Sequence, residues 1–368
     1  MDSLLDQLRG LSDVDCDTLD AEGNTSLVIF FAAKLGPFSD CTSNQAIVLG
    51  ELTKLDSDGN LLHRKLIHES VSKAHQHQLH SLSGLEVKEL AVELMMVGLS
   101  LQILPHITGR LHLQINPKHS YSVPNIIRNA ERLTSHFSLY SPSLDTRRVC
   151  IKIPSTWEGL QACRELEQRG IATLATTLFG KEQVALAGRA GCHYIAPYVN
   201  ELRVHFDPDY IDNNKALALC GSAQQYYESR GLNLKTQVMP ASLTSIDEVM
   251  QLAGVDRITV SPPLLAELAA TPATEWTGAA TVGQAITASA PGNDALHYNA
   301  EPSRRDPSND PYRHLEDVLE DEAQWRMAFT RSDGGKNEVK LIQALNIFCD
   351  QQEALEMLAE SHGALMMM

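Results

Sequence analysis

The feature that most constrains the fold is a local pattern that recurs along the chain: an amphipathic helical stretch, then a glycine, then a short apolar stretch with strand character. A glycine just past the last helical turn can take the left-handed conformation that ends a helix without steric cost, so the next strand begins at once. The pattern occurs five times, with Gly109, Gly170, Gly191, Gly231 and Gly254 before predicted strands at 110–116, 171–179, 192–199, 232–239 and 255–260.

The opposite junctions, from strand to helix, are also marked. Ser155 and Glu158 form an S-x-x-E capping box at the start of a predicted helix at 157–169, and Ser245 and Glu248 repeat the pattern. Strands that alternate with helices at this spacing indicate parallel strands joined by right-handed crossovers.

Three more short strands, at 13–17, 40–44 and 149–154, bring the predicted number to eight. Eight β–α units predict a closed (β/α)8 TIM-type barrel, with an open doubly wound sheet as the alternative. We expect one domain that consists of a barrel core at 1–269, a Pro- and Ala-rich insertion at 270–323 over the mouth or flank of the barrel, and a helical segment at 324–368 with a terminal helix from about 337 to 360.

Charge and apolar patterning exclude several classes of function. The formal net charge is −16, which disfavours binding to nucleic acid or to an anionic membrane surface. The longest apolar run, at 27–33, is far shorter than the ~20 residues that span a bilayer, and the acidic N-terminus does not resemble a signal peptide. Seven scattered cysteines without a C-x-x-C pair predict neither a disulfide framework nor a zinc site, so a cytoplasmic location is expected.

The histidines do not predict a metal site. His75, His77 and His80 lie among Gln and Ser on a predicted helix, where a solvated face is the simpler interpretation. His112 and His193 alternate with apolar residues on predicted strands, and we expect interior histidines with satisfied hydrogen bonds.

Lys152 is the main candidate for chemistry because it has the most apolar setting of any lysine in the chain, Val149-Cys150-Ile151-Lys152-Ile153-Pro154. At the C-terminal end of a barrel strand it would point toward the mouth, where active sites of such barrels are built. A desolvated lysine amine there can act as a nucleophile and form a Schiff base with a carbonyl.

Several segments resemble the transaldolase family. Lys152-Ile153-Pro154-Ser155-Thr156-Trp157-Glu158-Gly159 is similar to the segment that holds the Schiff-base lysine of this family, and Ala253-Gly254-Val255-Asp256-Arg257-Ile258-Thr259-Val260-Ser261-Pro262 is similar to its last barrel strand. Asp17-Thr18-Leu19-Asp20 and Thr42-Ser43-Asn44 are similar to its first and second strands. The resemblance runs from about 13 to 268, and implies an (α/β)8 barrel and class I aldol chemistry without a metal or other cofactor.

The resemblance also implies roles for single residues. Lys152 matches the Schiff-base lysine, and Asp17 matches the carboxylate that acts as acid and base on the substrate hydroxyl. Asn44 matches an amide that binds the donor substrate, and Thr176 matches a hydroxyl that holds the catalytic water. Further substrate-binding positions implied in this way are Asn116, Ala196 and Ser242.

Two of the matched positions depart from transaldolases. Gln114 stands where they have a glutamate on the third strand, and Tyr198 stands where they have a phenylalanine on the sixth. Both residues resemble the related fructose-6-phosphate aldolases, in which a glutamine, a threonine and a tyrosine hold the water that moves protons. Gln114, Thr176 and Tyr198 are therefore expected to form such a relay, because a tyrosine hydroxyl both donates and accepts protons.

A further departure concerns phosphate binding. Both branches of the family bind the substrate phosphate with two arginines, and these positions hold Glu201 and Thr244 here. A carboxylate in place of a guanidinium repels a phosphate group. Arg203, two residues beyond Glu201, is the candidate substitute if the strand alternation continues that far.

The sequence as a whole therefore predicts a transaldolase-like class I enzyme that makes or breaks a carbon–carbon bond through a Lys152 Schiff base. The expected partner is a small carbonyl compound, either an unphosphorylated hydroxyketone or a larger specialised metabolite. One alternative is a conventional transaldolase of sugar-phosphate metabolism, and another is a catalytically silent barrel with a binding or regulatory role. The resemblance leaves a homodimer open.

Overall fold

The structure is a computed structural model, and it describes residues 2–21, 37–80, 85–229, 235–278, 281–283 and 312–366. Gly231 and most of the predicted insertion at 270–323 lie outside these residues.

Eight parallel strands form one sheet in the order β7-β6-β5-β4-β3-β2-β1-β8. The strands are β1 (Asp13–Asp17), β2 (Cys41–Thr42), β3 (Leu111–Gln114), β4 (Val149–Pro154), β5 (Ala172–Leu178), β6 (Tyr194–Pro197), β7 (Gln237–Val238) and β8 (Arg257–Val260). The two end strands approach each other, and a backbone hydrogen bond of 3.4 Å from Thr259 N to Pro240 O joins β8 to the segment after β7. The predicted (β/α)8 barrel is thereby confirmed.

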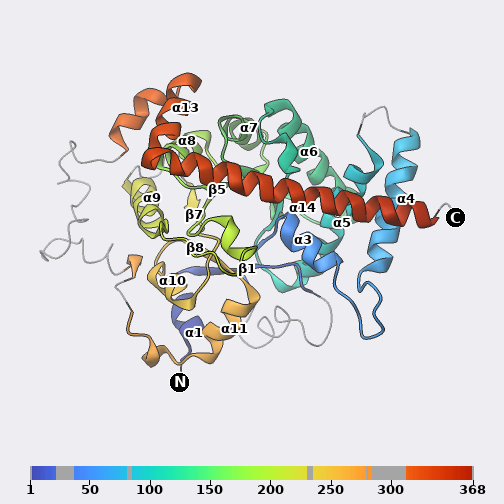
Figure 1. The fold of residues 1–368 in the computed structure, drawn as a ribbon, viewed down its shortest axis with the longest axis horizontal. Coiled ribbons are helices and arrows are strands. Elements are labelled where there is room, and N and C mark those ends of the chain that lie inside the picture. Colours follow the sequence, from blue (N-terminus) through green and yellow to red (C-terminus); the bar gives the residue numbers. More distant parts are fainter. Residues whose placement is uncertain are drawn as a thin grey trace, which may run out of the picture.

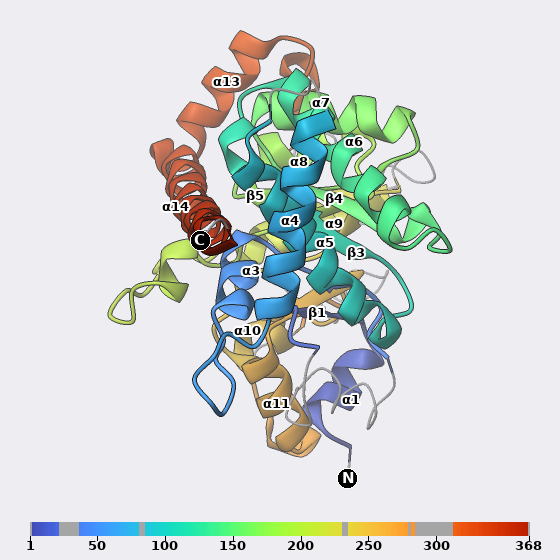
Figure 2. The same cartoon turned by 90° about the vertical axis from the view of Figure 1, so that its right-hand side faces the viewer.

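Helices surround the sheet (Figures 1 and 2). They are α1 (Leu4–Arg9), α3 (Gln45–Leu52), α4 (Arg64–His80), α5 (Val87–Ile103), α6 (Val123–Tyr140), α7 (Trp157–Gln168), α8 (Lys181–Ala190), α9 (Leu217–Ser229), α10 (Ile246–Gln251), α11 (Pro262–Ala270), α13 (Glu322–Arg331) and α14 (Lys336–Met366). The terminal helix α14 begins near the predicted position but extends several residues further.

Helix α14 runs across the width of the molecule (Figure 1). It contacts β5 and two short 3-10 helices, η2 (Pro117–His119) and η4 (Leu202–His205). Since η2 follows β3 and η4 follows β6, the helix lies over the carboxyl ends of the strands, which is the end where barrel enzymes carry their active sites.

Glycine has two different roles at the predicted junctions. Gly170, Gly191 and Gly254 have φ values of 79°, 77° and 104°, as expected for left-handed helix ends. The same prediction is wrong for Gly109, whose φ is not positive. Here glycine is needed for space, because a Cβ atom would lie 1.9 Å from Asp40 Oδ1.

One of the two predicted capping boxes is wrong, and the other is half formed. Thr156, not Ser155, caps α7 by accepting a hydrogen bond from Gly159 N, while the Ser155 hydroxyl donates to Thr176 O on the neighbouring strand. Ser245 caps α10 as predicted. The carboxylate of Glu248 binds Thr244 instead of completing the box.

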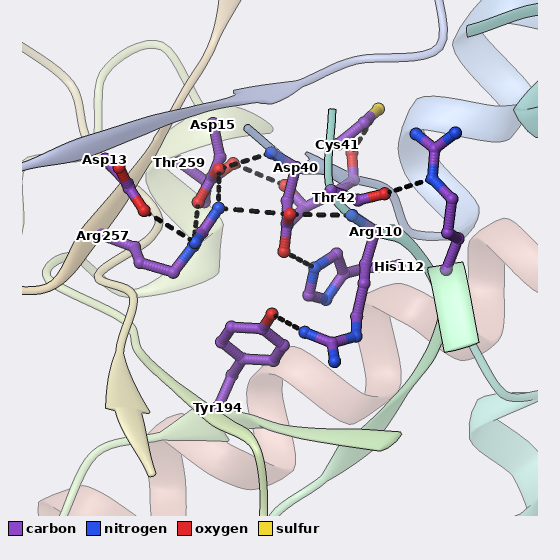
Figure 3. Close-up of polar contacts among 12 residues, drawn as sticks. Asp13, Asp15, Asp40, Cys41, Thr42, Arg110, His112, Tyr194, Arg257 and Thr259 are labelled. Carbon is purple, nitrogen blue, oxygen red and sulfur yellow. Dashed lines mark hydrogen bonds and ion pairs between the residues drawn. The ribbon is translucent and has the colours of Figure 1, made fainter. Parts of the chain in front are cut away.

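A network of charged side chains fills the barrel interior between β1, β2, β3, β6 and β8 (Figure 3). Arg257 donates two hydrogen bonds to Asp15, of 3.0 and 2.6 Å, and lies 3.2 Å from Asp40 Oδ1. Asp40 Oδ2 lies 2.8 Å from Nε2 of His112, and the His112 ring packs edge-on against Tyr194. These contacts connect strands that are far apart in the sequence.

Burial affects the pKa of Asp15, Asp40 and His112 in this network. Burial raises the pKa of Asp15 to about 7, although Arg257 opposes the shift. Burial alone would also raise the pKa of Asp40, but the His112 hydrogen bond and the nearby charges of His112 and Arg257 outweigh it and lower the pKa to about 2. Burial lowers the pKa of His112, although the hydrogen bond and the charge of Asp40 oppose the shift. Because a carboxylate only accepts, the ring donates from Nε2 to Asp40.

The space that Gly109 leaves for Asp40 can be tested by Gly109→Ala. We expect the free energy of unfolding to fall by about 1–3 kcal/mol, since the added methyl group must displace the Asp40 carboxylate. Gly50→Ala is the matched control, because a Cβ at Gly50 on α3 meets nothing within 4 Å. It should be neutral or stabilise by up to about 1 kcal/mol in the same urea titration. Equal effects of the two substitutions would contradict the close approach at Gly109.

The lowered pKa of Asp40 predicts a pH-dependent contribution to stability. A carboxyl group whose pKa falls from 3.8 to about 2 on folding stabilises the protein above pH 4, and this contribution is lost as the pH falls toward 2. The difference in unfolding free energy between the wild type and Asp40→Asn should shrink by about 1 kcal/mol from pH 5 to pH 3. Asp13→Asn, at an exposed carboxylate on the same arginine, is the matched control for the loss of a partner of Arg257. A constant difference for Asp40→Asn would disprove the assignment.

Candidate active site

The predicted catalytic side chains belong to strands whose carboxyl ends meet at one end of the barrel. Asp17 ends β1, Gln114 ends β3, and Lys152 and Thr176 lie in the last part of β4 and β5. The strand register pairs Gln114 with Lys152 and Pro154 with Thr176. Tyr198 directly follows β6 and forms a parallel bridge with Ala241.

Lys152 and Gln114 combine deep burial with missing partners. Lys152 is 2% exposed, and among the described residues its Nζ has no hydrogen-bond or ion-pair partner. Gln114 is fully buried, and neither Oε1 nor Nε2 of its amide has a partner in the described part of the chain. Buried polar groups are normally satisfied, so an unpaired amine beside an unpaired amide indicates a place built for a bound molecule or an ordered water.

Asp17 is held in place by two threonine hydroxyls. Thr42 Oγ1 donates to Asp17 Oδ1 at 2.6 Å, and Thr42 Oγ1 also lies 2.6 Å from Thr259 Oγ1. Because the single Thr42 proton goes to the carboxylate, Thr259 must be the donor in the second bond. The chain of hydroxyls orients the carboxylate, and its second oxygen has no hydrogen-bond partner in the described part of the chain.

Thr176 and Tyr198 face each other across β5 and β6. Thr176 Oγ1 lies 3.4 Å from Tyr198 Oη, which is longer than an ordinary O–H···O hydrogen bond of about 2.5–3.0 Å. Next to Thr176, Thr177 has a φ of 51°, and Ser242 after β7 has a φ of 59°. Non-glycine residues in this region store strain of about 1–3 kcal/mol and are typical of functional sites.

The predicted substrate-binding residues lie around the same end of the barrel. The Oδ1 of Asn44 caps α3 by accepting from Ala46 N and Ile47 N, and its Nδ2 has no partner among the residues that the structure describes. Asn116 follows β3 and caps η2, so its Oδ1 is likewise used by the backbone. Ala196 is buried on β6, and Ser242 contacts His205.

The two residues that replace the phosphate-binding arginines, and Arg203 as their candidate substitute, all form hydrogen bonds with other residues of the protein. Glu201 accepts hydrogen bonds of 2.9 Å from Tyr210 and from Gln343 of α14. Arg203, the candidate substitute for the missing arginines, is half exposed, donates twice to Asp207 and stacks on Tyr210. Thr244 donates from its backbone N and its hydroxyl to Glu248.

Helix α14 supplies further charged groups to this end of the barrel. Lys340 is 5% exposed and donates to Asp212 and to the carbonyl of Asn214, with Glu201 Oε1 at 3.9 Å. Lys118 of η2 pairs with Glu356. Contacts of the barrel loops with a helix so distant in sequence could not be read from the local pattern.

The structure corrects or limits the predictions for histidines. His112 is interior as predicted, but its Nδ1 has no partner within the described ranges, so the ring is only half satisfied. His193 is not interior: its side chain is 44% exposed and pairs with Glu167. The side chains of His77 and His80 lie outside the described residues. No cluster that could hold a metal ion occurs among the side chains that are described.

Sequence reasoning missed Thr42 and Thr259 as the groups that fix Asp17, and it missed His205. Both threonines lie in segments that resemble the second and last strands of the family, and both are buried in strands whose residues are all buried. His205 carries no local signal, because only its contact with Ser242 brings it to the mouth.

Together, these features place a buried lysine, without a partner among the described residues, at the same carboxyl end of a parallel barrel as a carboxylate fixed by a threonine hydroxyl. This is the arrangement that nucleophilic chemistry on a carbonyl requires. The comparison with known proteins agrees with this class: the family described as Transaldolase/Fructose-6-phosphate aldolase matches residues 16–308.

Similar proteins named "Transaldolase" include one from Chlamydia pneumoniae, 30% identical over 73% of this chain and 77% of its own length, and one from Chlamydia caviae, 31% identical over the same shares. "Transaldolase A" of Pasteurella multocida is 30% identical over 73% of this chain and 80% of its own length. The chain therefore belongs to the transaldolase/fructose-6-phosphate aldolase family and is an aldolase-type enzyme. The likeness of Gln114 and Tyr198 to the fructose-6-phosphate aldolase branch stays a prediction.

Within the described residues, none of the helices is long and apolar enough to cross a membrane.

The missing partner of Lys152 can be tested through stability. Lys152→Met removes an unpaired buried amine, so we expect the free energy of unfolding to rise by about 1–2 kcal/mol. Lys340→Met is the matched control, since it removes a buried lysine that is paired with Asp212, and it should lower stability by about 3 kcal/mol. Urea titrations of both variants check the prediction, and a destabilised Lys152→Met would contradict it.

Proposed function

We propose that this enzyme makes and breaks carbon–carbon bonds of sugars through a Schiff base on Lys152. The single observation that carries the proposal is the burial of Lys152 without an ion-pair partner among the described residues, at the carboxyl end of the barrel. Its place in the transaldolase family supports the same chemistry.

In the proposed reaction, the Lys152 amine attacks the ketone carbon of a ketose. The carbonyl oxygen leaves as water, and a carbon–nitrogen double bond forms. Asp17 then takes the proton from a hydroxyl two carbons from the iminium carbon. The neighbouring carbon–carbon bond breaks, its electron pair moves toward the iminium nitrogen, and an aldehyde leaves. Addition of the resulting enamine to a second aldehyde reverses these steps and returns the proton from Asp17.

The other polar groups would move protons to and from the departing oxygen. The 3.4 Å gap between Thr176 Oγ1 and Tyr198 Oη and the unpartnered amide of Gln114 both suit a water molecule held between these side chains. Such a water can protonate the leaving hydroxide during imine formation and deliver a proton to the enamine. Asn44 Nδ2 would then bind a hydroxyl of the ketose.

Two candidate substrates follow from different observations. The relatives named Transaldolase support the sugar phosphates of a conventional transaldolase. The second candidate is an unphosphorylated sugar or hydroxyketone. It is favoured by Glu201 and Thr244 at the positions where the resemblance implies arginines, and by the engagement of Arg203 with Asp207.

Borohydride trapping tests the chemistry and separates the substrates. The full-length protein is incubated with dihydroxyacetone or with fructose 6-phosphate, reduced, and weighed by intact-mass spectrometry. We expect an adduct that Lys152→Met does not form, because reduction fixes the imine on that lysine. Lys340→Met is the matched control, and we expect it still to form the adduct. This result would show that the adduct requires Lys152 in particular and not any buried lysine.

The outcomes discriminate between the candidates. Trapping with dihydroxyacetone but little with fructose 6-phosphate favours an unphosphorylated substrate, whereas equal trapping favours a conventional transaldolase. An adduct that persists in Lys152→Met would show that another amine reacts and would refute the assignment to Lys152. No adduct with either compound would also refute it and leave the silent barrel as the better account.

A further inference from the structure

His205 reaches the barrel mouth from an element that local sequence does not mark as part of the site. It ends the 3-10 helix η4 after β6, and its Nε2 lies 2.9 Å from Ser242 Oγ after β7. Ser242 directly follows Ala241, which bridges to Tyr198. The His205–Ser242 pair therefore lies at the same end of the barrel as Tyr198.

The position of Ser242 is fixed by its surroundings. Its φ of 59° is unfavourable for a residue other than glycine, and its carbonyl accepts hydrogen bonds of 3.2 Å from Asn200 N and 2.8 Å from Asn200 Nδ2. Asn200 is held in turn by the buried carboxylate of Glu248. A strained backbone that is held this firmly presents its side chain in one direction, as recognition sites require.

The pair offers complementary hydrogen-bonding groups. The surrounding protein partly desolvates the His205 ring and lowers its pKa, while the carboxylates of Asp17 and Glu248 oppose the shift, so the imidazole is neutral at pH 7. Its Nδ1 has no partner in the described segments. Whichever group donates in the His205–Ser242 bond, one donor and one acceptor remain for a ligand, which matches a hydroxyl group.

The charges at the mouth disfavour an anionic ligand end. The nearby cations already form ion pairs, namely Arg203 with Asp207, Lys215 with Glu248, and Lys340 with Asp212. The carboxylate of Glu201 adds negative charge. A neutral imidazole with a serine hydroxyl is suited to an uncharged polar group.

We propose that His205 is a specificity-determining residue that binds, together with Ser242, a hydroxyl at the far end of the sugar substrate. This inference rests on the proposed function, since the near end of that substrate is the carbonyl that reacts with Lys152. A three-carbon ketone on Lys152 does not require this contact, whereas a four-carbon aldehyde does.

The test compares substrates of different length in the full-length enzyme. His205→Phe should raise the KM for erythrose about tenfold, the effect of one lost hydrogen bond, with dihydroxyacetone as the donor. The rate of borohydride trapping with dihydroxyacetone should not change. His205→Asn, which keeps a polar group near the Nδ1 position, should restore most of the erythrose KM. His193→Gln, at an exposed histidine before β6, is the matched control and should change neither value.

Three results would overturn the inference. The erythrose KM of His205→Phe could equal that of the wild type. Its trapping with dihydroxyacetone could fall in parallel with its use of erythrose, which indicates a structural role. Its defect could appear with erythrose 4-phosphate and not with erythrose, which indicates a phosphate contact. Wild-type trapping is measured first, because a missing Lys152 adduct refutes the proposed function together with this inference, whereas normal trapping with an unchanged KM refutes the inference alone.

Discussion

The ion pairs of the Arg257 guanidinium with Asp15 and Asp40 are the interactions on which the barrel depends most. The guanidinium lies inside the barrel and binds the carboxylates of Asp15 and Asp40, which come from the first and second β–α units, while Arg257 itself belongs to the last strand (Figure 3). The β7–β8 seam has little backbone pairing, so the cross-barrel ion pairs join the end of the fold to its beginning. Separating a buried ion pair is costly, and this cost favours one relative position of these strands.

The polar side chains nearer the carboxyl ends of the strands form a second layer, in which buried groups lack partners among the described residues. Lys152 and Gln114 are buried as deeply as Asp15, yet they have no partners among the described residues. Asp17 is the exception, because Thr42 and Thr259 fix its carboxylate. The lower layer stabilises the fold through paired charges, whereas the polar groups of Gln114 in the upper layer are buried without partners among the described residues, which costs stability. The two layers share strands β1, β3 and β8. The candidate site therefore lies on the strands that the buried ion pairs and hydrogen bonds join.

Much of the fold was predictable because it follows from local rules. Alternating strands and helices, with glycines at their junctions, were sufficient for eight parallel strands and a closed barrel. The errors were also local in origin: Gly109 was assigned a left-handed helix end although Asp40 fills the space beside it, and Ser155 was assigned a cap that Thr156 provides. Both depend on a neighbour in space that the local pattern does not contain. The place of Lys152, Asp17, Gln114, Thr176 and Tyr198 at the carboxyl end followed from the strand assignments, whereas their roles still await measurement.

The sequence by itself determined the parallel barrel, the family and the lysine at the end of the fourth strand, because these depend on periodicity and on contiguous motifs. Only the tertiary structure decided what surrounds the mouth. Glu201 is bound by Gln343 from α14, Arg203 is turned toward Asp207, and His205 meets Ser242. Apart from the local Arg203–Asp207 pair, these contacts join residues 37 or more positions apart. Such pairings are set by the packing of whole elements and leave no trace in the spacing of neighbouring residues.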